Sequence, residues 1–224
     1  MKIKLLISFL FLNQVWAFTL VNSNGARFPQ DYVTVDVAAV TGSDCDQAGT
    51  TPEGLLDLVD EAIALWNGYP TSRLRLVKGS VQNVGATFAT ATLCNNAGST
   101  CDPNSALFSD SDILIICNEE NTQNFTSTQV LGLTVPNQVD GRDINGSVIL
   151  INNIAGSGVA SLSEAQLIST IAHEIGHAIG LGHSEVTDSL MYYQNVGNRE
   201  NLGWDDVDGL TYLYRQRFSL FGAN

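Results

Sequence analysis

The amino-acid sequence predicts a mixed α+β domain, and three observations support that fold class. Segments with strand-like patterns dominate the earlier part of the chain, two helical patterns follow them, and one further helical pattern lies near the start. Strands that precede helices, with one early crossover helix, are typical of α+β domains. No internal repeat, low-complexity linker or abrupt change of composition divides the chain, so we expect a single domain.

Five segments have the pattern of β-strands: residues 31–40, 72–79, 111–118, 129–136 and 146–153. The first two alternate apolar and polar side chains, as half-buried strands do. The third is a short apolar run of the kind that a central strand shows. The last two are joined by a turn-rich segment, residues 137–145, which contains Asn, Asp and Gly.

Three segments have helical periodicity. Residues 51–69 have apolar side chains at helical spacing up to Trp66, and Gly68 follows this apolar face. Residues 161–178 begin with a capping box from Ser161 to Glu164, and apolar residues then recur at helical spacing. A last helix is predicted over residues 204–216, with an inner face formed by Val207, Leu210, Leu213 and Tyr214.

The N-terminus has the features of a secretory signal peptide. Lys2 and Lys4 precede an apolar run over residues 5–12, and small residues stand where a signal peptidase reads the chain, before Phe18. We therefore expect residues 1–17 to be removed and residues 18–224 to form one exported domain; a buried N-terminal strand is the alternative. No other segment is apolar enough to cross a bilayer, so a secreted product free of the membrane is expected.

The net charge limits the classes of binding partner, and the cysteine count predicts the disulfides. The formal net charge of −13 argues against nucleic acids and anionic membranes, which bind basic patches. In an oxidising compartment four cysteines predict two disulfides, with three possible pairings. We favour Cys94–Cys101, which closes a short loop, and this leaves Cys45–Cys117. A cysteine metal site is the weaker interpretation, because no C-x-x-C pair is present.

All three histidines of the chain lie within residues 173–183. His173 and His177 are four residues apart on the predicted helix, so both imidazoles project from one face and can hold one zinc ion. Glu174 lies beside the first histidine, where it can reach a water on the metal without binding the metal itself. This spacing predicts a zinc site with Glu174 as the general base.

A zinc ion that does chemistry needs a third protein ligand and an open position. His183 can supply that ligand if the chain reverses after the helix, and Gly180 permits the reversal because glycine takes positive φ without steric cost. A bare H-E-x-x-H occurs by chance in unrelated proteins. Here every histidine falls on the pattern, together with the glutamate and the glycine, which favours a catalytic centre over a closed structural site.

The residues "HEIGHAIGLGHS" resemble the metzincin zinc signature, and the serine after His183 makes them most similar to the matrixin (matrix metalloprotease) branch. Met191, eight residues after His183, matches the methionine of the matrixin Met-turn. Residues 202–216 are similar to the matrixin C-terminal helix, including the paired acids Asp205 and Asp206. Residues 60–76 and 109–117 resemble earlier matrixin elements more weakly.

The resemblance implies a zincin-like fold and a proteolytic activity. The fold is a twisted, mostly parallel sheet with an antiparallel edge strand, an active-site helix and a C-terminal helix. The implied reaction is peptide-bond hydrolysis with one catalytic zinc, on an extended peptide that pairs with the edge strand at Leu131–Val135. Met191 is implied to lie beneath the zinc as an apolar floor; an ordinary core methionine is the alternative.

Three departures from the matrixin pattern change these expectations. The chain has no histidines left for the second, structural zinc of matrixins, so that ion is expected to be absent. No cysteine precedes Cys45, so latency through a cysteine on the zinc is not expected. Tyr193 stands where matrixins commonly have proline, as in the Met-turns of astacins and serralysins. It is therefore a candidate oxyanion-stabilising residue, with packing as the alternative role.

Two other functions stay open from sequence. One is a zinc-binding adhesion or interaction module without catalysis, although such proteins commonly lose the glutamate or a ligand. The other is an enzyme that uses the same zinc on a non-peptide bond. Asp140 and Asp143 are candidate calcium ligands beside a turn glycine, but two acids in a turn are usually just solvated. We expect a monomer whose partners are protein or peptide substrates.

Overall fold

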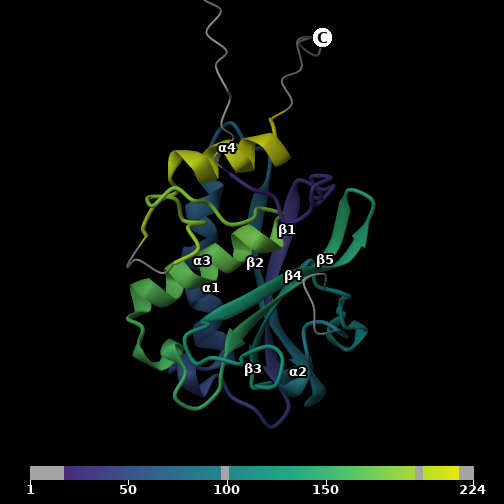
Figure 1. The fold of residues 1–224 in the computed structure, drawn as a ribbon, viewed down its shortest axis with the longest axis vertical. Coiled ribbons are helices and arrows are strands. Elements are labelled where there is room, and N and C mark those ends of the chain that lie inside the picture. Colours follow the sequence, from purple (N-terminus) through teal and green to yellow (C-terminus); the bar gives the residue numbers. More distant parts are fainter. Residues whose placement is uncertain (1–17, 97–100, 195–198, 217–224) are drawn as a thin grey trace, which may run out of the picture.

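Figure 1 shows the fold in a computed structural model, which describes residues 18–96, 101–194 and 199–216. The predicted signal peptide, residues 1–17, lies outside the described residues. The strands are β1 (Tyr32–Val40), β2 (Arg75–Val84), β3 (Ile113–Asn118), β4 (Gly132–Asp140) and β5 (Asp143–Asn152). The helices are α1 (Pro52–Asn67), α2 (Thr87–Thr90), α3 (Glu164–Ala178) and α4 (Trp204–Leu213). Within these described ranges, no helix combines the length and the apolar composition needed to span a membrane.

The five strands form one sheet in the order β2-β1-β3-β5-β4. The pairs β1–β2, β1–β3 and β3–β5 are parallel, and β4 pairs antiparallel with β5 at the edge. This arrangement confirms the predicted mixed fold with a mostly parallel sheet and an antiparallel edge strand. β4 is therefore left with one edge that no other strand of the sheet covers.

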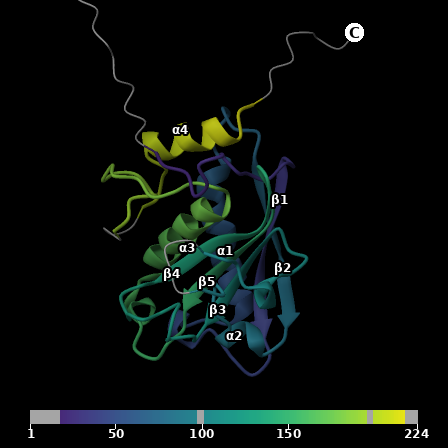
Figure 2. The same ribbon diagram turned by 45° about the vertical axis from the view of Figure 1, so that its right-hand side comes forward.

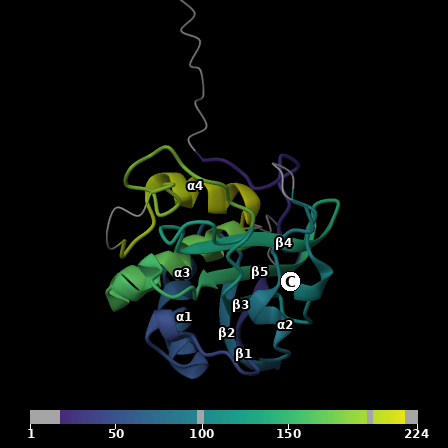
Figure 3. The same ribbon diagram turned by 60° about the horizontal axis from the view of Figure 1, so that its bottom comes forward.

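Helices cover the two faces of the sheet unequally. The long helices α1 and α3 pack side by side on one face, while the short α2 lies on the other, as Figures 2 and 3 show. Each face has its own cluster of buried apolar side chains, and the larger cluster lies between the sheet and the two long helices. α4 crosses one end of the molecule, beyond the end of α3 (Figure 1). The site described below lies between α3 and the β4 edge.

The position of α3 follows from its caps and from α1. Ser163 caps its N-terminus by accepting from the backbone N–H of Gln166, whose side chain accepts in turn from the Ser163 N–H. The capping box therefore lies two residues after the predicted Ser161–Glu164 pair, and that prediction was wrong in register. Trp66 of α1 is 1% exposed, and its indole N–H donates to the Ala172 carbonyl at 2.9 Å. This bond fixes α3 against α1.

β4 and β5 extend into the turn-rich segment that was predicted to join them. Only Gly141 and Arg142 separate the two strands, and Gly141 takes a φ of 61° that suits a two-residue hairpin. The register shifts between Val135 and Gln138, so a bulge contains Pro136. Proline has no N–H to give to a ladder, and it is tolerated at such an edge-strand bulge.

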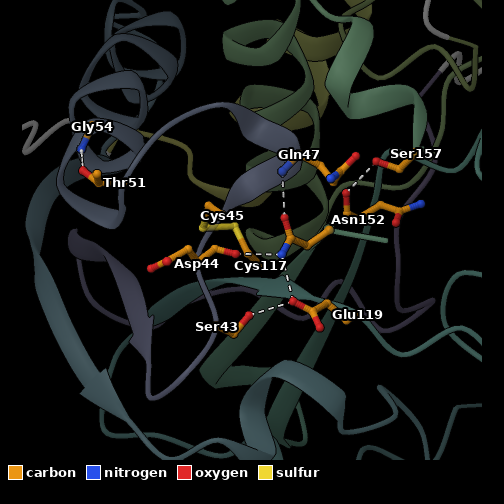
Figure 4. Close-up of a disulfide and its surroundings, with 11 residues drawn as sticks. Ser43, Asp44, Cys45, Gln47, Thr51, Gly54, Cys117, Glu119, Asn152 and Ser157 are labelled. Carbon is orange, nitrogen blue, oxygen red and sulfur yellow. Dashed lines mark hydrogen bonds between the residues drawn. A yellow bond between two sulfur atoms is a disulfide. The ribbon is translucent and has the colours of Figure 1, made fainter. Parts of the chain in front are cut away.

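The structure contains two disulfides, Cys45–Cys117 and Cys94–Cys101, which is the pairing favoured from sequence. Cys45–Cys117 joins the loop before α1 to the end of β3, as Figure 4 shows. Around it, the Asn153 amide donates to the Asp44 carbonyl at 2.7 Å and to the Glu119 carboxylate at 3.0 Å. Ser43 also donates to Glu119, at 2.8 Å (Figure 4). The disulfide is therefore set in a hydrogen-bonded junction of three chain segments.

The two disulfides are expected to differ in their contribution to stability. Their cysteines are 72 and 7 residues apart. The loop-entropy estimate gives a loss of about 4 kcal/mol in the free energy of unfolding for Cys45→Ala with Cys117→Ala. The same estimate gives about 2 kcal/mol for Cys94→Ala with Cys101→Ala. Urea unfolding followed by tryptophan fluorescence measures both, and an equal or reversed order would contradict the expectation.

Candidate metal centre

A cleft of about 360 Å³ lies between the edge strand β4 and helix α3. One wall is formed by residues 129–133, at the start of β4, and the other by Leu190 and residues 192–194. Ser169, Thr170, His173 and Glu174 contribute from α3, and His183 and Arg199 complete the lining. The cleft therefore brings together chain segments that are far apart in the sequence.

The three histidines converge at this cleft, which His173 and His183 line directly. One ring nitrogen from each of His173, His177 and His183 lies within 4.8 Å of the others. The Nε2 atoms of His177 and His183 are 3.2 Å apart. Two nitrogens bound tetrahedrally to one zinc at about 2.0–2.1 Å lie roughly 3.3 Å apart, so this spacing fits a shared zinc ion. In the described part of the chain, this is the one group of three or more His, Cys, Asp or Glu side chains arranged to hold a metal.

Gly180 makes the reversal that returns His183 to the helix. α3 ends at Ala178, and Gly180 takes a φ of 107°, which L side chains rarely adopt. A β-carbon at this position would also lie 2.4 Å from the Ala26 carbonyl oxygen. The Leu181 N–H donates back to the Gly176 carbonyl at 2.9 Å and closes the turn. Both backbone conformation and lack of space therefore require glycine here.

Backbone carbonyls orient two of the imidazoles. His173 Nδ1 lies 2.7 Å from the Leu190 carbonyl, and His177 Nδ1 lies 2.8 Å from the Leu181 carbonyl. An Nδ1–H that donates to a carbonyl leaves the Nε2 lone pair free for a metal. Burial lowers the pKa of His177 to about 3, and burial also lowers the pKa of His183. The lowered pKa values of His177 and His183 favour neutral imidazole nitrogens, which zinc prefers as ligands.

Glu174 lies in the same cleft but is 6% exposed. Burial raises the pKa of its carboxyl group, while His173 and a hydrogen bond from Thr134 act in the opposite direction. Thr134 of β4 donates from Oγ1 to Glu174 Oε2 at 2.6 Å. A carboxyl group with a raised pKa beside a metal site has the properties of a proton acceptor and donor near neutral pH.

Met191 packs beneath the helix that carries the first two histidines. It is 2% exposed, and a β-carbon on Gly176 would lie only 2.2 Å from its sulfur. Gly176 immediately precedes His177, so the sulfur is in contact with the turn of α3 between the two histidines. This location suits the apolar floor implied by the resemblance, and that role stays a prediction.

The carboxylate of Asp206 holds the segment that contains Met191. It accepts hydrogen bonds from the backbone N–H groups of Leu190 and Met191, at 2.6 and 3.0 Å, and from the hydroxyl of Ser189. It also accepts from the Gly203 N–H, at 2.8 Å, at the start of α4. Asp206 is 1% exposed. A single buried carboxylate thus joins α4 to this part of the cleft wall.

The segment after residue 17 pairs with the loop that carries His183. Leu20 forms an antiparallel bridge with Leu181, and the Gly182 N–H donates to the Thr19 carbonyl at 2.8 Å. The Thr19 hydroxyl donates to the carbonyl of His183 at 2.6 Å. The backbone of the third histidine is therefore held by residues more than 160 positions earlier in the chain.

The other residues singled out from the sequence are Tyr193, Asp140 and Asp143. Tyr193 is 56% exposed, lines the cleft, and stacks on Tyr192 with ring centroids 4.6 Å apart. Its role in oxyanion stabilisation stays a prediction. Asp140 and Asp143 are exposed and pair across the β4–β5 hairpin. Calcium binding by these two residues stays a prediction.

Four residues that shape the site were not assigned a role from sequence: Gly132, Thr134, Asp206 and Thr19. Gly132 and Thr134 lie within a predicted strand. The only signal in the sequence for Thr134 is that it is a polar residue on the inner face of this edge strand. In the sequence, Asp206 stands out only through its similarity to the matrixin C-terminal helix, although an acid at the third position of a helix is a capping signal. Thr19 has no local signal, because its partner is distant in sequence.

Comparison with known proteins gives a consistent result. A family model described as matrixin matches residues 87–215, which is more than half of the chain. Metalloendoproteinase 2-MMP of Arabidopsis thaliana is 52% identical over 50 residues, 21% of this chain and 13% of that protein. Karilysin of Tannerella forsythia is 40% identical over 72 residues, 32% of this chain and 14% of that protein. Matrilysin of Rattus norvegicus is 39% identical over 61 residues, 26% of this chain. The matched stretch is 23% of matrilysin, so the chain matches less than a quarter of each relative.

Replacing Asp206 by alanine is expected to destabilise the fold and the site together. Three backbone N–H groups and one hydroxyl lose their acceptor in a buried place. We expect a loss of about 3 kcal/mol or more in the free energy of unfolding, measured by urea unfolding. Asp208→Ala, on the exposed side of the same helix, is the matched control and is expected to change stability by less than about 0.5 kcal/mol. Similar losses for both variants would show that Asp206 does not hold the segment.

Proposed function

The chain belongs to the matrixin family, and we propose that it is an exported zinc-dependent endopeptidase with Glu174 as its general base. Family membership supports the class of zinc metalloendopeptidase. The observation that carries the proposal is the convergence of three imidazoles, two of which line a cleft together with one buried carboxylate, beside an uncovered sheet edge.

His173, His177 and His183 are the proposed zinc ligands. They provide three ring nitrogens close enough to share one ion, and the cleft beside them leaves room for water and substrate. A zinc ion held in this way supplies a Lewis acid that makes water more acidic and polarises a carbonyl group. The carbonyls of Leu190 and Leu181 keep two of the rings in the orientation that exposes Nε2.

Glu174 is the proposed proton carrier. Its carboxylate takes the proton from the attacking water and later delivers it to the leaving amine. The raised pKa that burial gives this group supports both steps, because an acid that is too strong holds a proton poorly. The buried position of the side chain also keeps bulk water away from the carboxylate while it transfers the proton.

The proposed substrate is an extended peptide that pairs with the uncovered edge of β4. Residues 131–133 line the cleft directly beside Glu174, so a strand added to this edge passes the histidines. The bulge at Pro136 limits this surface, because proline offers no N–H and the register shifts there. We therefore propose that backbone pairing is confined to Leu131–Val135.

Export and partners complete the proposal. We propose that residues 1–17 direct the chain out of the cell, that it acts as a monomer, and that residues 18–224 form one catalytic domain. The basic start and the apolar run of the N-terminus support export. Expression of the full chain with N-terminal sequencing of the secreted product is expected to give Phe18 as the first residue. Retention of Met1 in a secreted product would contradict this cleavage.

Glu174→Ala is expected to retain zinc and to lose nearly all proteolysis. Loss of a general base typically lowers the rate by about 10²- to 10⁴-fold. The measurements are cleavage of a peptide library by the wild-type chain with and without a chelator, the same assay on the variant, and metal content by mass spectrometry. Glu61→Ala, exposed on α1, is the matched control for loss of a glutamate and is expected to keep full activity.

The outcomes separate this proposal from the alternatives. Chelator-sensitive cleavage that Glu174→Ala abolishes supports the endopeptidase, whereas a wild-type chain that binds zinc without cleaving supports a binding module. Substantial activity in Glu174→Ala would remove the general-base role. His183→Ala is the complementary variant: we expect it to weaken zinc binding by more than the 10–100-fold typical of outer partners of a metal site. Unchanged zinc affinity there would exclude His183 as a ligand.

A further inference from the structure

The β4 strand contacts Glu174 through two residues of one face. Thr134 donates from Oγ1 to Glu174 Oε2 at 2.6 Å, and this is a short hydrogen bond of the kind that charged acceptors make. Gly132, two residues earlier, lies against the same carboxyl group. A β-carbon built on Gly132 would lie 2.8 Å from Oε1 and 2.9 Å from Cδ, closer than such contacts occur. The strand therefore touches both oxygens of the carboxylate.

We propose that Thr134 is a positioning residue for Glu174, and that Gly132 and Thr134 form a seat on β4 that fixes which carboxylate oxygen faces the histidines. This inference rests on the proposed function, because it assigns a role to Thr134 only if Glu174 is the general base. The hydroxyl holds Oε2, and the absence of a side chain at residue 132 makes room for Oε1.

The register of the sheet makes this seat rigid. Gly132 pairs with Ile151 and Thr134 pairs with Ile149 on β5. Both isoleucines are buried in the core cluster beneath α1 and α3, with exposures of 1% and 0%. Alternate residues of a strand share one face, so Gly132 and Thr134 are presented toward α3 together. The seat is thus anchored by an internal strand of the sheet.

The hydroxyl of Thr134 restricts the rotation of the Glu174 carboxylate. The carboxylate of a glutamate rotates about its last bond with little preference between positions. A partner on one oxygen removes that freedom and leaves the other oxygen for proton transfer, which requires hydrogen-bond distance and alignment. In the described residues, the Thr134 hydroxyl is the one hydrogen-bond donor recorded for Glu174. Without it, the carboxylate has no fixed orientation.

The test compares three substitutions at residue 134 in the full chain loaded with zinc. Thr134→Val removes the hydroxyl and keeps the shape, and we expect kcat to fall by about ten- to a hundredfold with KM unchanged. Thr134→Ser keeps the hydroxyl and loses the methyl group, and we expect kcat close to that of the wild-type chain. Thr134→Ala removes the same hydroxyl with less apolar bulk, and it takes the place of the valine variant if that variant does not fold.

Two controls test whether a general effect of the substitution, loss of zinc or loss of folding explains a lower kcat. Thr34→Val makes the same chemical change in β1, away from the cleft, and is expected to leave kcat and KM unchanged. Zinc content and the midpoint of thermal unfolding are measured for every variant, and both are expected to be retained in the valine and serine variants. A purely structural role of Thr134 would instead lower the unfolding midpoint and leave kcat of the folded protein intact.

Three results would overturn the proposal: kcat of Thr134→Val within twofold of the wild-type value, an equal loss in Thr134→Ser, or a rise in KM with unchanged kcat. The last result would place Thr134 in substrate binding instead. The assay also separates this inference from the proposed function. If the wild-type chain cleaves and Glu174→Ala does not, the function stands whatever Thr134 does. If the wild-type chain does not cleave, the function itself fails.

Discussion

The hydrogen bonds accepted by the buried carboxylate of Asp206 hold the segment that contacts His173 and the residue after His183. It accepts from the backbone of Leu190 and Met191, so the position of this segment is set by helix α4. The Leu190 carbonyl then orients the ring of His173, and the Met191 carbonyl accepts from the Ser184 N–H at 2.8 Å, next to His183. One carboxylate at the start of a C-terminal helix thereby determines the placement of two histidines that it does not touch.

The second constraint is the contact between α3 and the sheet edge. α3 supplies His173, His177 and Glu174 from adjacent turns, and β4 supplies the surface against which Glu174 lies. The same strand carries the uncovered edge proposed for substrate pairing, so β4 would position both the proposed general base and the proposed substrate. A rigid strand positions both more accurately than a flexible loop would.

The features that the sequence predicted well are those encoded locally. Histidines four residues apart on a helix and a glycine three residues after the second define a geometry within a short stretch, and the structure brings the three rings together. The mostly parallel sheet with an antiparallel edge strand also agreed, and this expectation came from the family resemblance. The capping box was misplaced because both Ser161–Glu164 and Ser163–Gln166 fit the pattern, and only packing selects between them.

Contacts between distant segments escaped prediction for a physical reason. The hydrogen bond from Thr134 to Glu174 joins residues 40 positions apart, and it depends on the register of β4. A slip of one residue would turn the threonine to the opposite face of the sheet, and the sequence alone does not specify that register. The hairpin between β4 and β5 shows the same limit, because pairing between the two strands continues into the segment that composition marked as turn-rich.

The pairing of Thr19 with His183 couples metal binding to the folding of the whole chain. The third histidine is held in place only when residues 164 positions apart have come together. A ligand that binds the folded state alone stabilises that state by mass action, in proportion to the logarithm of its concentration over its dissociation constant. Zinc bound at the proposed site would therefore stabilise the contact between Thr19 and the loop that carries His183. A change that loosens this contact would then lower the apparent affinity for zinc, although it lies outside the proposed coordination sphere.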